Sequence, residues 1–176
     1  LDAENIVEVK NGKGIYVGSG GQQSYSIQSI LGFTQEKERL LEALEARRAM
    51  EKELLVMVIH SATDQEMEEL GRITENLMKK VRANLQDTKE DKEFHEMIYK
   101  MCHNQVFYAM LDLLDKYTEK LWEFPLEMTD PFKESMPYHE ELYDALRNRD
   151  VKRAQKINNK LLDCVYADIV NQLKKI

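Results

Sequence analysis

The chain has 176 residues and is 43% apolar, which is enough to bury one sizeable core. Its net charge of −7 means that most of its surface repels a phosphate backbone, so the main contact with any DNA partner is expected outside this chain. The sequence has no cysteine pair with metal-site spacing, no signal segment and no apolar run of about 18 residues, so we expect a reduced, cytoplasmic protein without a membrane partner.

The first 18 residues predict a two-stranded hairpin. Mostly β-branched and aromatic residues at 6–9 and 15–17 flank the pair Asn11-Gly12, which accepts the positive φ of a tight turn. Residues 19–29 are rich in Gly, Gln and Ser, which is typical of a linker with few groups to bury. Because the chain begins at Leu1, without an initiator methionine and inside this unit, we expect a further segment upstream.

Helical spacing of the apolar residues begins at about residue 34 and continues almost to the end of the chain. A first long helix is expected to end at about His60, and Thr63 and Glu66 predict a capping box that starts the second helix. Asp150 is the expected N-cap of the last helix. The sequence therefore predicts a mainly α fold, an antiparallel bundle of about six helices preceded by the β-hairpin. The later helices are expected at residues 89–103, 104–122, 134–148 and 150–174.

Asp91 and His95 are candidate metal ligands. They are four residues apart on one predicted helix, so their side chains project from the same face one turn apart. His139 lies near the start of a later helix, and a bundle can bring it opposite this pair. Oxygen and imidazole donors of this kind suit zinc, nickel or manganese. The alternative is that Asp91 caps its helix and His95 fills a core position with its hydrogen bonds satisfied.

The motifs of a hydrolytic enzyme are missing from the sequence. There is no G-x-S-x-G nucleophile motif, and Cys102 cannot pair with the adjacent His103, because successive helical residues point about 100° apart. We therefore do not expect an enzyme. A small helical metalloenzyme that uses Asp91, His95 and His139 with an open coordination position stays an alternative.

Several short patterns follow one another along the helical part of the chain. Arg47 is followed four residues later by Glu51, the stretch 91–95 has the form D-x-x-F-H and is followed by Asn104, and residues 139–154 have the form H-x-x-L-x-x-A-L, then D-x-x-x-A. In this order the patterns resemble the FCD effector-binding domain of FadR-type regulators in the GntR family. Residues 1–17 resemble the last helical turn and the wing of a winged helix-turn-helix.

This resemblance implies a domain organisation. Residues 1–20 would be the wing remnant of a winged helix-turn-helix DNA-binding domain, residues 21–35 a linker, and residues 36–176 the helical effector-binding domain. Asn11 and Lys13, at the hairpin tip, would then contact phosphate or the minor groove. Otherwise they are ordinary turn residues.

The resemblance also bears on the metal. In metal-binding members of the family the pocket holds a divalent ion on one Asp and three His, and Asp91, His95 and His139 match three of these positions. The fourth position falls on Leu161, which cannot ligate a metal, and Cys164, one turn further on, is a remote substitute. Three donors can still hold zinc or nickel, with water or an effector carboxylate in the open position. Alternatively the pocket has lost its metal and become more apolar, as in the acyl-CoA-sensing members.

Arg47 and Asn104 are the candidates for effector contact that the resemblance implies. A guanidinium can fork onto a carboxylate and an amide can hydrogen-bond to it, so we expect a small organic acid as effector. The alternative for Arg47 is a surface pair with Glu51.

We therefore expect a ligand-responsive bacterial transcription regulator that works as a homodimer, as the resemblance implies. Effector binding in the bundle would favour one arrangement of the two DNA-binding domains over another. The operator would be bound through the full-length protein, because the helix-turn-helix proper is missing here. A helical interaction module whose pocket is merely packed core is a further alternative.

Overall fold

The computed structural model describes residues 7–10, 14–17, 36–85, 88–123 and 133–174. The chain divides into two compact units, Leu1–Thr34 and Gln35–Ile176, and each is described by itself. Among the described helices, none combines the length and the apolar character that spanning a membrane requires.

Two short strands form the described part of the first unit. Strand β1 (Val7–Lys10) pairs antiparallel with β2 (Gly14–Val17), with Val7 opposite Val17 and Lys10 opposite Gly14. The predicted DNA contacts Asn11 and Lys13 lie outside the described residues, as does the predicted linker at 21–35. The assignment of residues 1–20 to a wing stays a prediction.

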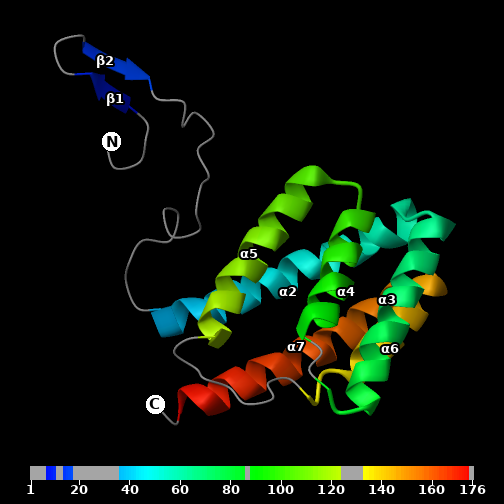
Figure 1. Cartoon of the computed structure of the whole chain (residues 1–176). Helices are drawn as coiled ribbons and strands as arrows, with labels where there is room; N and C mark the ends of the chain where they lie inside the picture. The colour runs from blue at the N-terminus through cyan, green and yellow to red at the C-terminus, as the bar shows by residue number, and fades with distance from the viewer. Residues whose placement is uncertain (1–6, 11–13, 18–35, 86–87, 124–132, 175–176) are drawn as a thin grey trace. The chain divides into compact units, whose positions relative to one another are not determined.

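Six helices make up the described part of the second unit, and Figure 1 shows how they are arranged. They are α2 (Glu36–Ser61), α3 (Asp64–Arg82), α4 (Thr88–Met101), α5 (Gln105–Glu123), α6 (Pro137–Arg147) and α7 (Val151–Leu173). The prediction of a mainly helical fold is confirmed, and the predicted boundaries agree with the observed ones to within a few residues.

Local signals in the sequence start several of these helices. The Thr63 hydroxyl accepts a hydrogen bond from Glu66 N at 3.2 Å, and Thr63 N donates to Glu66 Oε2 at 2.8 Å, so the predicted capping box of α3 is confirmed. The carboxylate of Asp150 caps α7 by accepting from Arg153 N at 3.0 Å. Pro137 opens α6, where a helix needs no N–H donor.

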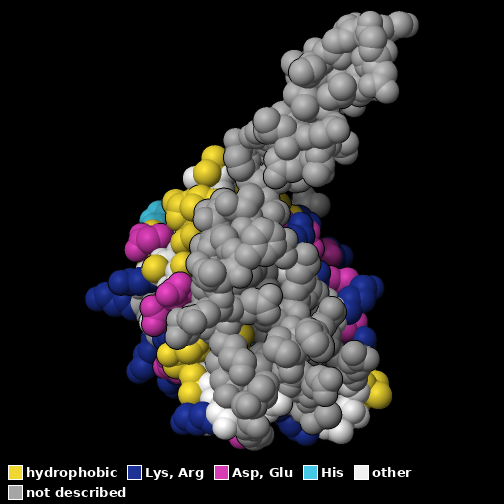
Figure 2. All heavy atoms as spheres, turned by 90° about the vertical axis from the view of Figure 1, so that its left-hand side faces the viewer, with side chains coloured by type: hydrophobic (Ala, Val, Ile, Leu, Met, Phe, Trp, Pro, Cys, Tyr) yellow, Lys and Arg dark blue, Asp and Glu magenta, His cyan; other side chains and the backbone are white. Residues whose placement is uncertain are grey.

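Helix α2 lies at the centre of the bundle, because it contacts α4, α5, α6 and α7. Its apolar residues Leu54, Leu55 and Val58 are almost fully buried in the common core. A helix with neighbours on several sides also buries some of its polar positions, and both Arg47 and Glu51 of α2 are less than 5% exposed. The face of the molecule in Figure 2 shows acidic, basic and apolar side chains intermixed on the described residues. Arg47 and Glu51 of α2 are therefore charges of the interior, whereas Glu42, Glu45, Lys52 and Glu53 of the same helix are exposed.

Candidate metal centre

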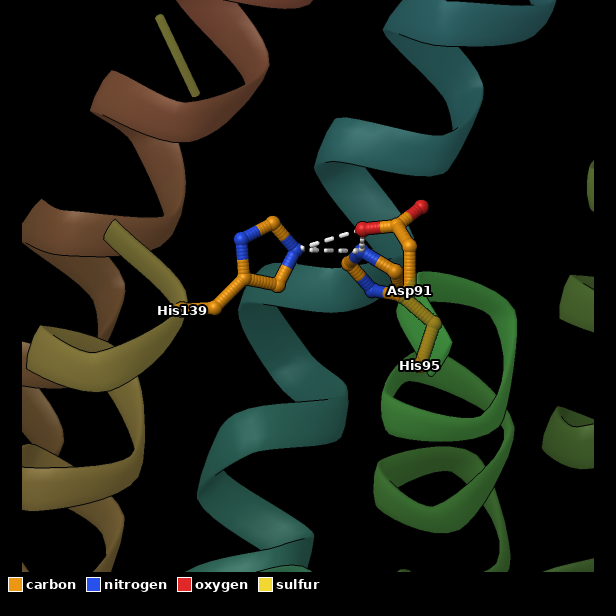
Figure 3. Close-up of side chains that lie close together, drawn as sticks. All are labelled: Asp91, His95 and His139. Carbon is orange, nitrogen blue, oxygen red and sulfur yellow. Dashed lines mark hydrogen bonds and ion pairs between the residues drawn. The ribbon is translucent and has the colours of Figure 1, made fainter. Parts of the chain in front are cut away.

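Helices α4 and α6 bring Asp91, His95 and His139 together, as Figure 3 shows. One possible ligand atom of each residue lies within 4.8 Å of those of the other two. Asp91 Oδ1 is 2.8 Å from His139 Nε2 and 3.8 Å from His95 Nε2, and the two Nε2 atoms are 3.3 Å apart. The predicted convergence of these side chains is thus observed, whereas their role as metal ligands stays a prediction.

The cluster is buried on its imidazole side and more open at the carboxylate. His95 is 8% and His139 1% exposed, whereas the side chain of Asp91 is 23% exposed. Phe94 packs edge-on against both imidazole rings and forms an apolar wall. The alternative that Asp91 is the N-cap of its helix is wrong, because α4 already begins at Thr88.

A hydrogen bond to the backbone determines which ring nitrogen of His139 carries a proton. Its Nδ1 lies 3.0 Å from the carbonyl oxygen of Met136, which can only accept a hydrogen bond, so Nδ1 carries the proton. In a neutral ring, Nε2 then presents a lone pair to the carboxylate of Asp91 at 2.8 Å. Two lone pairs at this distance need a cation between them, either a proton on Nε2 or a metal ion. The surroundings of His139 therefore fit a metal ion.

Arg47 orients the other imidazole. Nη2 of Arg47 lies 3.4 Å from His95 Nδ1, and a guanidinium can only donate, so Nδ1 is the acceptor in this contact. A neutral His95 in this arrangement carries its proton on Nε2, the atom that faces Asp91 and His139. Binding a metal through Nε2 requires the proton on Nδ1 instead, so Arg47 would have to leave His95.

The surrounding charges favour protonation states that can bind a metal. Burial alone would raise the pKa of Asp91, but the hydrogen bond and charge of His139, with His95 and Arg47, lower it to about 2. Burial and the charges of Arg47 and His139 lower the pKa of His95 to about 4, against the opposite effect of Asp91. At neutral pH Asp91 is therefore ionised and His95 is neutral, as metal ligation requires.

Arg47 is also the centre of a buried group of charges beside this cluster. Its Nε lies 2.7 Å from Glu51 Oε1, and its Nη1 lies 3.0 Å from Asp115 Oδ1 on α5. Glu51 further accepts hydrogen bonds from the Tyr99 hydroxyl and the Asn158 amide, both at 2.8 Å. The predicted Arg47–Glu51 pair exists, but the idea that it lies at the surface is wrong, because its side chains are 5% and 3% exposed.

The two carboxylates that flank Arg47 differ in their pKa values. Burial alone would raise the pKa of Glu51, but the charges of Arg47 and His95 and the hydrogen bonds from Arg47 and Asn158 lower it to about 2. Burial raises the pKa of Asp115 to about 6, although Arg47 acts in the opposite direction. Glu51 is thus the better stabilised of the two carboxylates.

The other predicted positions have different surroundings. The side-chain oxygen of Asn104 accepts from Val106 N at 3.1 Å and Phe107 N at 3.2 Å, so it caps α5, and its contact with an effector stays a prediction. Leu161 is buried in the core on α7 and has no ligand atom. Cys164 does not belong to the cluster of potential ligands that the described residues form.

Sequence reasoning missed Asp115, Tyr99 and Asn158, which complete the charge network. For Asp115 a signal was present, because it directly follows Leu113 and Leu114 in an apolar stretch of α5, and a carboxylate beside apolar residues is a candidate for burial. Tyr99 and Asn158 lie within ordinary helical patterns that carry no comparable signal.

Carboxylate, imidazole and guanidinium groups thus gather in the interior of this helical unit. The family model of the FCD domain matches residues 42–163, so the chain belongs to the FCD family. The resemblance seen in the sequence is thereby confirmed for this domain, and the relatives that the chain matches are regulators of the GntR family.

Two curated relatives are regulators. The chain is 26% identical over 161 residues to the uncharacterized HTH-type transcriptional regulator YcbG of Bacillus subtilis. This alignment covers 88% of the chain and 63% of YcbG. It is 27% identical over 124 residues to the Uxu operon regulator of Haemophilus influenzae. That alignment covers 70% of the chain and 42% of the Uxu operon regulator. The chain thus spans less than two thirds of the length of either relative.

Solved structures support the fold. Streptococcus agalactiae GntR superposes with a TM-score of 0.68 at 21% identity, covering 94% of this chain and 76% of that one. E. coli McbR/YncC superposes with a TM-score of 0.64 at 18% identity, covering 98% of this chain and 80% of that one. Both likenesses concern the fold alone.

Proposed function

We propose that this chain is the effector-sensing part of a FadR-type transcription regulator, in which the helical unit binds a small organic acid with the help of a divalent metal ion. The observation that carries the proposal is the convergence of Asp91, His95 and His139 inside the region that matches the FCD family. One carboxylate and two imidazoles suit zinc or nickel, and three protein ligands leave a position open for water or an effector carboxylate.

Arg47 would link the metal to the effector. Ligation through His95 Nε2 requires that Arg47 give up its contact with His95 Nδ1, so one terminal nitrogen of the guanidinium becomes available to a carboxylate. Asn104 stays a candidate for effector contact on the family resemblance alone, because its side-chain oxygen caps α5. In this proposal metal binding prepares the site for the acid.

The link to DNA lies outside the helical unit. The curated relatives are described as an HTH-type transcriptional regulator and an operon regulator, which supports a full-length protein that binds an operator. Strands β1 and β2 would be the wing of its DNA-binding domain, and the regulator would act as a cytoplasmic homodimer. The effector would change operator affinity by binding one arrangement of the dimer more tightly than another.

The alternatives receive less support. An acyl-CoA sensor would need an apolar chamber, whereas the interior beside the cluster holds the charged side chains of Arg47, Glu51 and Asp115. A metalloenzyme would need relatives with catalytic activity, and both curated relatives are regulators. A ligand-free interaction module would explain the contact of Asp91 with His139 by a proton on Nε2, but the curated relatives are described as regulators.

Metal content tests the proposal. Elemental analysis of the wild-type chain after exposure to zinc or nickel and removal of excess metal should find about one ion per chain. His95→Ala and His139→Ala should lose most of this metal. His103→Ala is the matched control, because His103 is exposed and pairs with Glu66 instead, and it should bind as the wild type does. A metal content near zero in the wild type and in all three variants would show that these residues do not form a metal site.

Effector binding needs a separate experiment. Thermal-shift screening of the metal-loaded chain with hydroxy acids, sugar acids and acyl-CoAs should find a stabilising acid, because a ligand that binds the folded state raises the unfolding temperature. Arg47→Lys keeps the charge but has a single nitrogen, which cannot contact Glu51 and Asp115 and also reach the effector as the three guanidinium nitrogens can, so it should reduce this stabilisation. If stabilisation by the acid is unchanged, Arg47 does not hold the carboxylate.

A further inference from the structure

Only one of the two carboxylates that flank Arg47 has its full set of hydrogen-bond donors among the described residues. Glu51 accepts from Arg47, Tyr99 and Asn158. Asp115 Oδ1 lies 3.0 Å from Arg47 Nη1 but is buried without a well-directed hydrogen bond from any described residue. The Tyr99 hydroxyl has a single proton, so it can donate to Glu51, 2.8 Å away, or to Asp115, but not to both. Asp115 is therefore the carboxylate that lacks a donor.

The charges of the cluster also show an excess of carboxylates. Two carboxylates, Glu51 and Asp115, share the single positive charge of Arg47. A divalent ion would lie beside Asp91, at the other end of the guanidinium from Asp115. A buried carboxylate that lacks a donor is costly, and Asp115 would keep this deficit when the metal is bound.

The side chain of Asp115 is more open than that of Glu51, although its Oδ1 atom is itself buried. Its side chain is 27% exposed, compared with 3% for Glu51. The two terminal nitrogens of Arg47 contact His95 and Asp115, so these two residues lie within the span of one small molecule. An acid bound beside the metal ligands could therefore place a neighbouring substituent against Asp115.

We propose that Asp115 is a specificity-determining residue, which accepts a hydrogen bond from a hydroxyl or ammonium group on the effector. The inference rests on the proposed function, because it assumes that an acid binds beside Asp91, His95 and His139. It narrows the effector class to hydroxy acids and amino acids, since a plain carboxylic acid leaves Asp115 without a donor. A hydrogen bond to a charged group corresponds to a preference of roughly 10- to 100-fold in affinity.

Matched ligands test this role in the zinc-loaded 176-residue chain. Calorimetry would compare propionate with lactate and alanine, and succinate with malate and aspartate. The wild type should bind a hydroxy or amino member at least roughly tenfold more tightly than the plain acid of its series. Asp115→Ala should bind the plain acid at least as well as the wild type does and should lose the preference.

Two further variants separate recognition from folding. Asp112→Ala changes a carboxylate on the same helix that pairs with Lys116, and it should keep the wild-type preference. Asp115→Asn keeps the shape and an acceptor oxygen, so it should retain part of the preference for a hydroxyl group and lose the preference for an ammonium group. An Asp115→Asn variant with the full wild-type preference for the amino acid would contradict the role of the charge.

The outcomes distinguish this inference from the proposed function. If the wild type binds the plain and substituted acids equally, or if Asp115→Ala keeps the preference, the role of Asp115 is overturned while acid sensing stands. If no acid of either series binds the wild type, acid sensing itself is overturned, and the role of Asp115 with it.

Discussion

Glu51→Gln removes one charge from the centre of the buried network and keeps the shape of the side chain. In the wild type Glu51 is 2% exposed and accepts hydrogen bonds from Arg47, Tyr99 and Asn158. The neutral amide leaves the buried guanidinium with Asp115 as its carboxylate partner. We expect a large loss of stability for this substitution, because a buried charge that loses a partner keeps its cost of desolvation.

The magnitude follows from the pKa of Glu51. It is about 2 in the folded protein and 4.5 as the ordinary value of the unfolded chain, a difference that corresponds to about 3 kcal/mol of stability. Breaking a buried ion pair by removing one partner costs roughly 3 to 5 kcal/mol, in agreement with this value. Because the folded pKa is the lower one, the contribution is fully present above pH 4.5 and is lost as the pH falls towards 2.

Urea unfolding followed by circular dichroism at pH 7, 4 and 3 measures this effect. At pH 7 Glu51→Gln should be about 3 kcal/mol less stable than the wild type, and the difference should narrow as the pH falls. Glu75→Gln, which alters an exposed carboxylate that pairs with Lys79, should unfold as the wild type does. A loss below about 1 kcal/mol at pH 7, or one that does not change with pH, would refute the reasoning.

Three further substitutions test the fold and the site. Thr63→Ala should cost about 1 kcal/mol in urea unfolding, because it removes the hydroxyl that caps α3, whereas Thr63→Ser should cost little; equal stability of the two variants would argue against the cap. Gly71→Ala should lower the melting temperature, because the added Cβ would lie 2.5 Å from the Tyr143 hydroxyl oxygen, and Tyr143→Leu in the same chain should restore part of the loss. If Gly71→Ala has the melting temperature of the wild type, the space between Gly71 of α3 and Tyr143 of α6 is wide enough for a Cβ atom. Leu161→His should enlarge the rise in melting temperature that zinc produces, and an unchanged rise would show that Leu161 does not occupy a fourth ligand position.

The helices could be predicted because their signals are local. Apolar spacing marks the buried face of α7, where Ala154, Ile157 and Leu161 are buried, and the side chains of Thr63 and Asp150 mark where helices begin. The placement of Asp91 and His95 could be predicted for the same reason, since a spacing of four residues puts both on one face of α4. The contribution of His139 depends on how α4 and α6 pack, and the family resemblance supplied what the spacing could not.

The charge network could not be predicted in the same way. Sequence patterns treat Arg47 and Glu51 as a solvent-facing pair, because charged residues are mostly exposed. Their burial follows from the contacts of α2 with four other helices, and a local pattern does not show how many neighbours a helix has. The contact between Arg47 and Asp115 joins positions far apart in the chain, so it became visible only in the fold.

X-ray absorption spectroscopy of the zinc-loaded chain tests the central claim most directly, because it identifies the atoms bound to the metal. We predict two imidazole nitrogens at about 2.0–2.1 Å and a carboxylate oxygen at about 2.0–2.2 Å, with one imidazole lost in His139→Ala. A sulfur neighbour at about 2.3 Å, or a spectrum without imidazole scattering, would contradict the assignment of Asp91, His95 and His139 as the metal ligands.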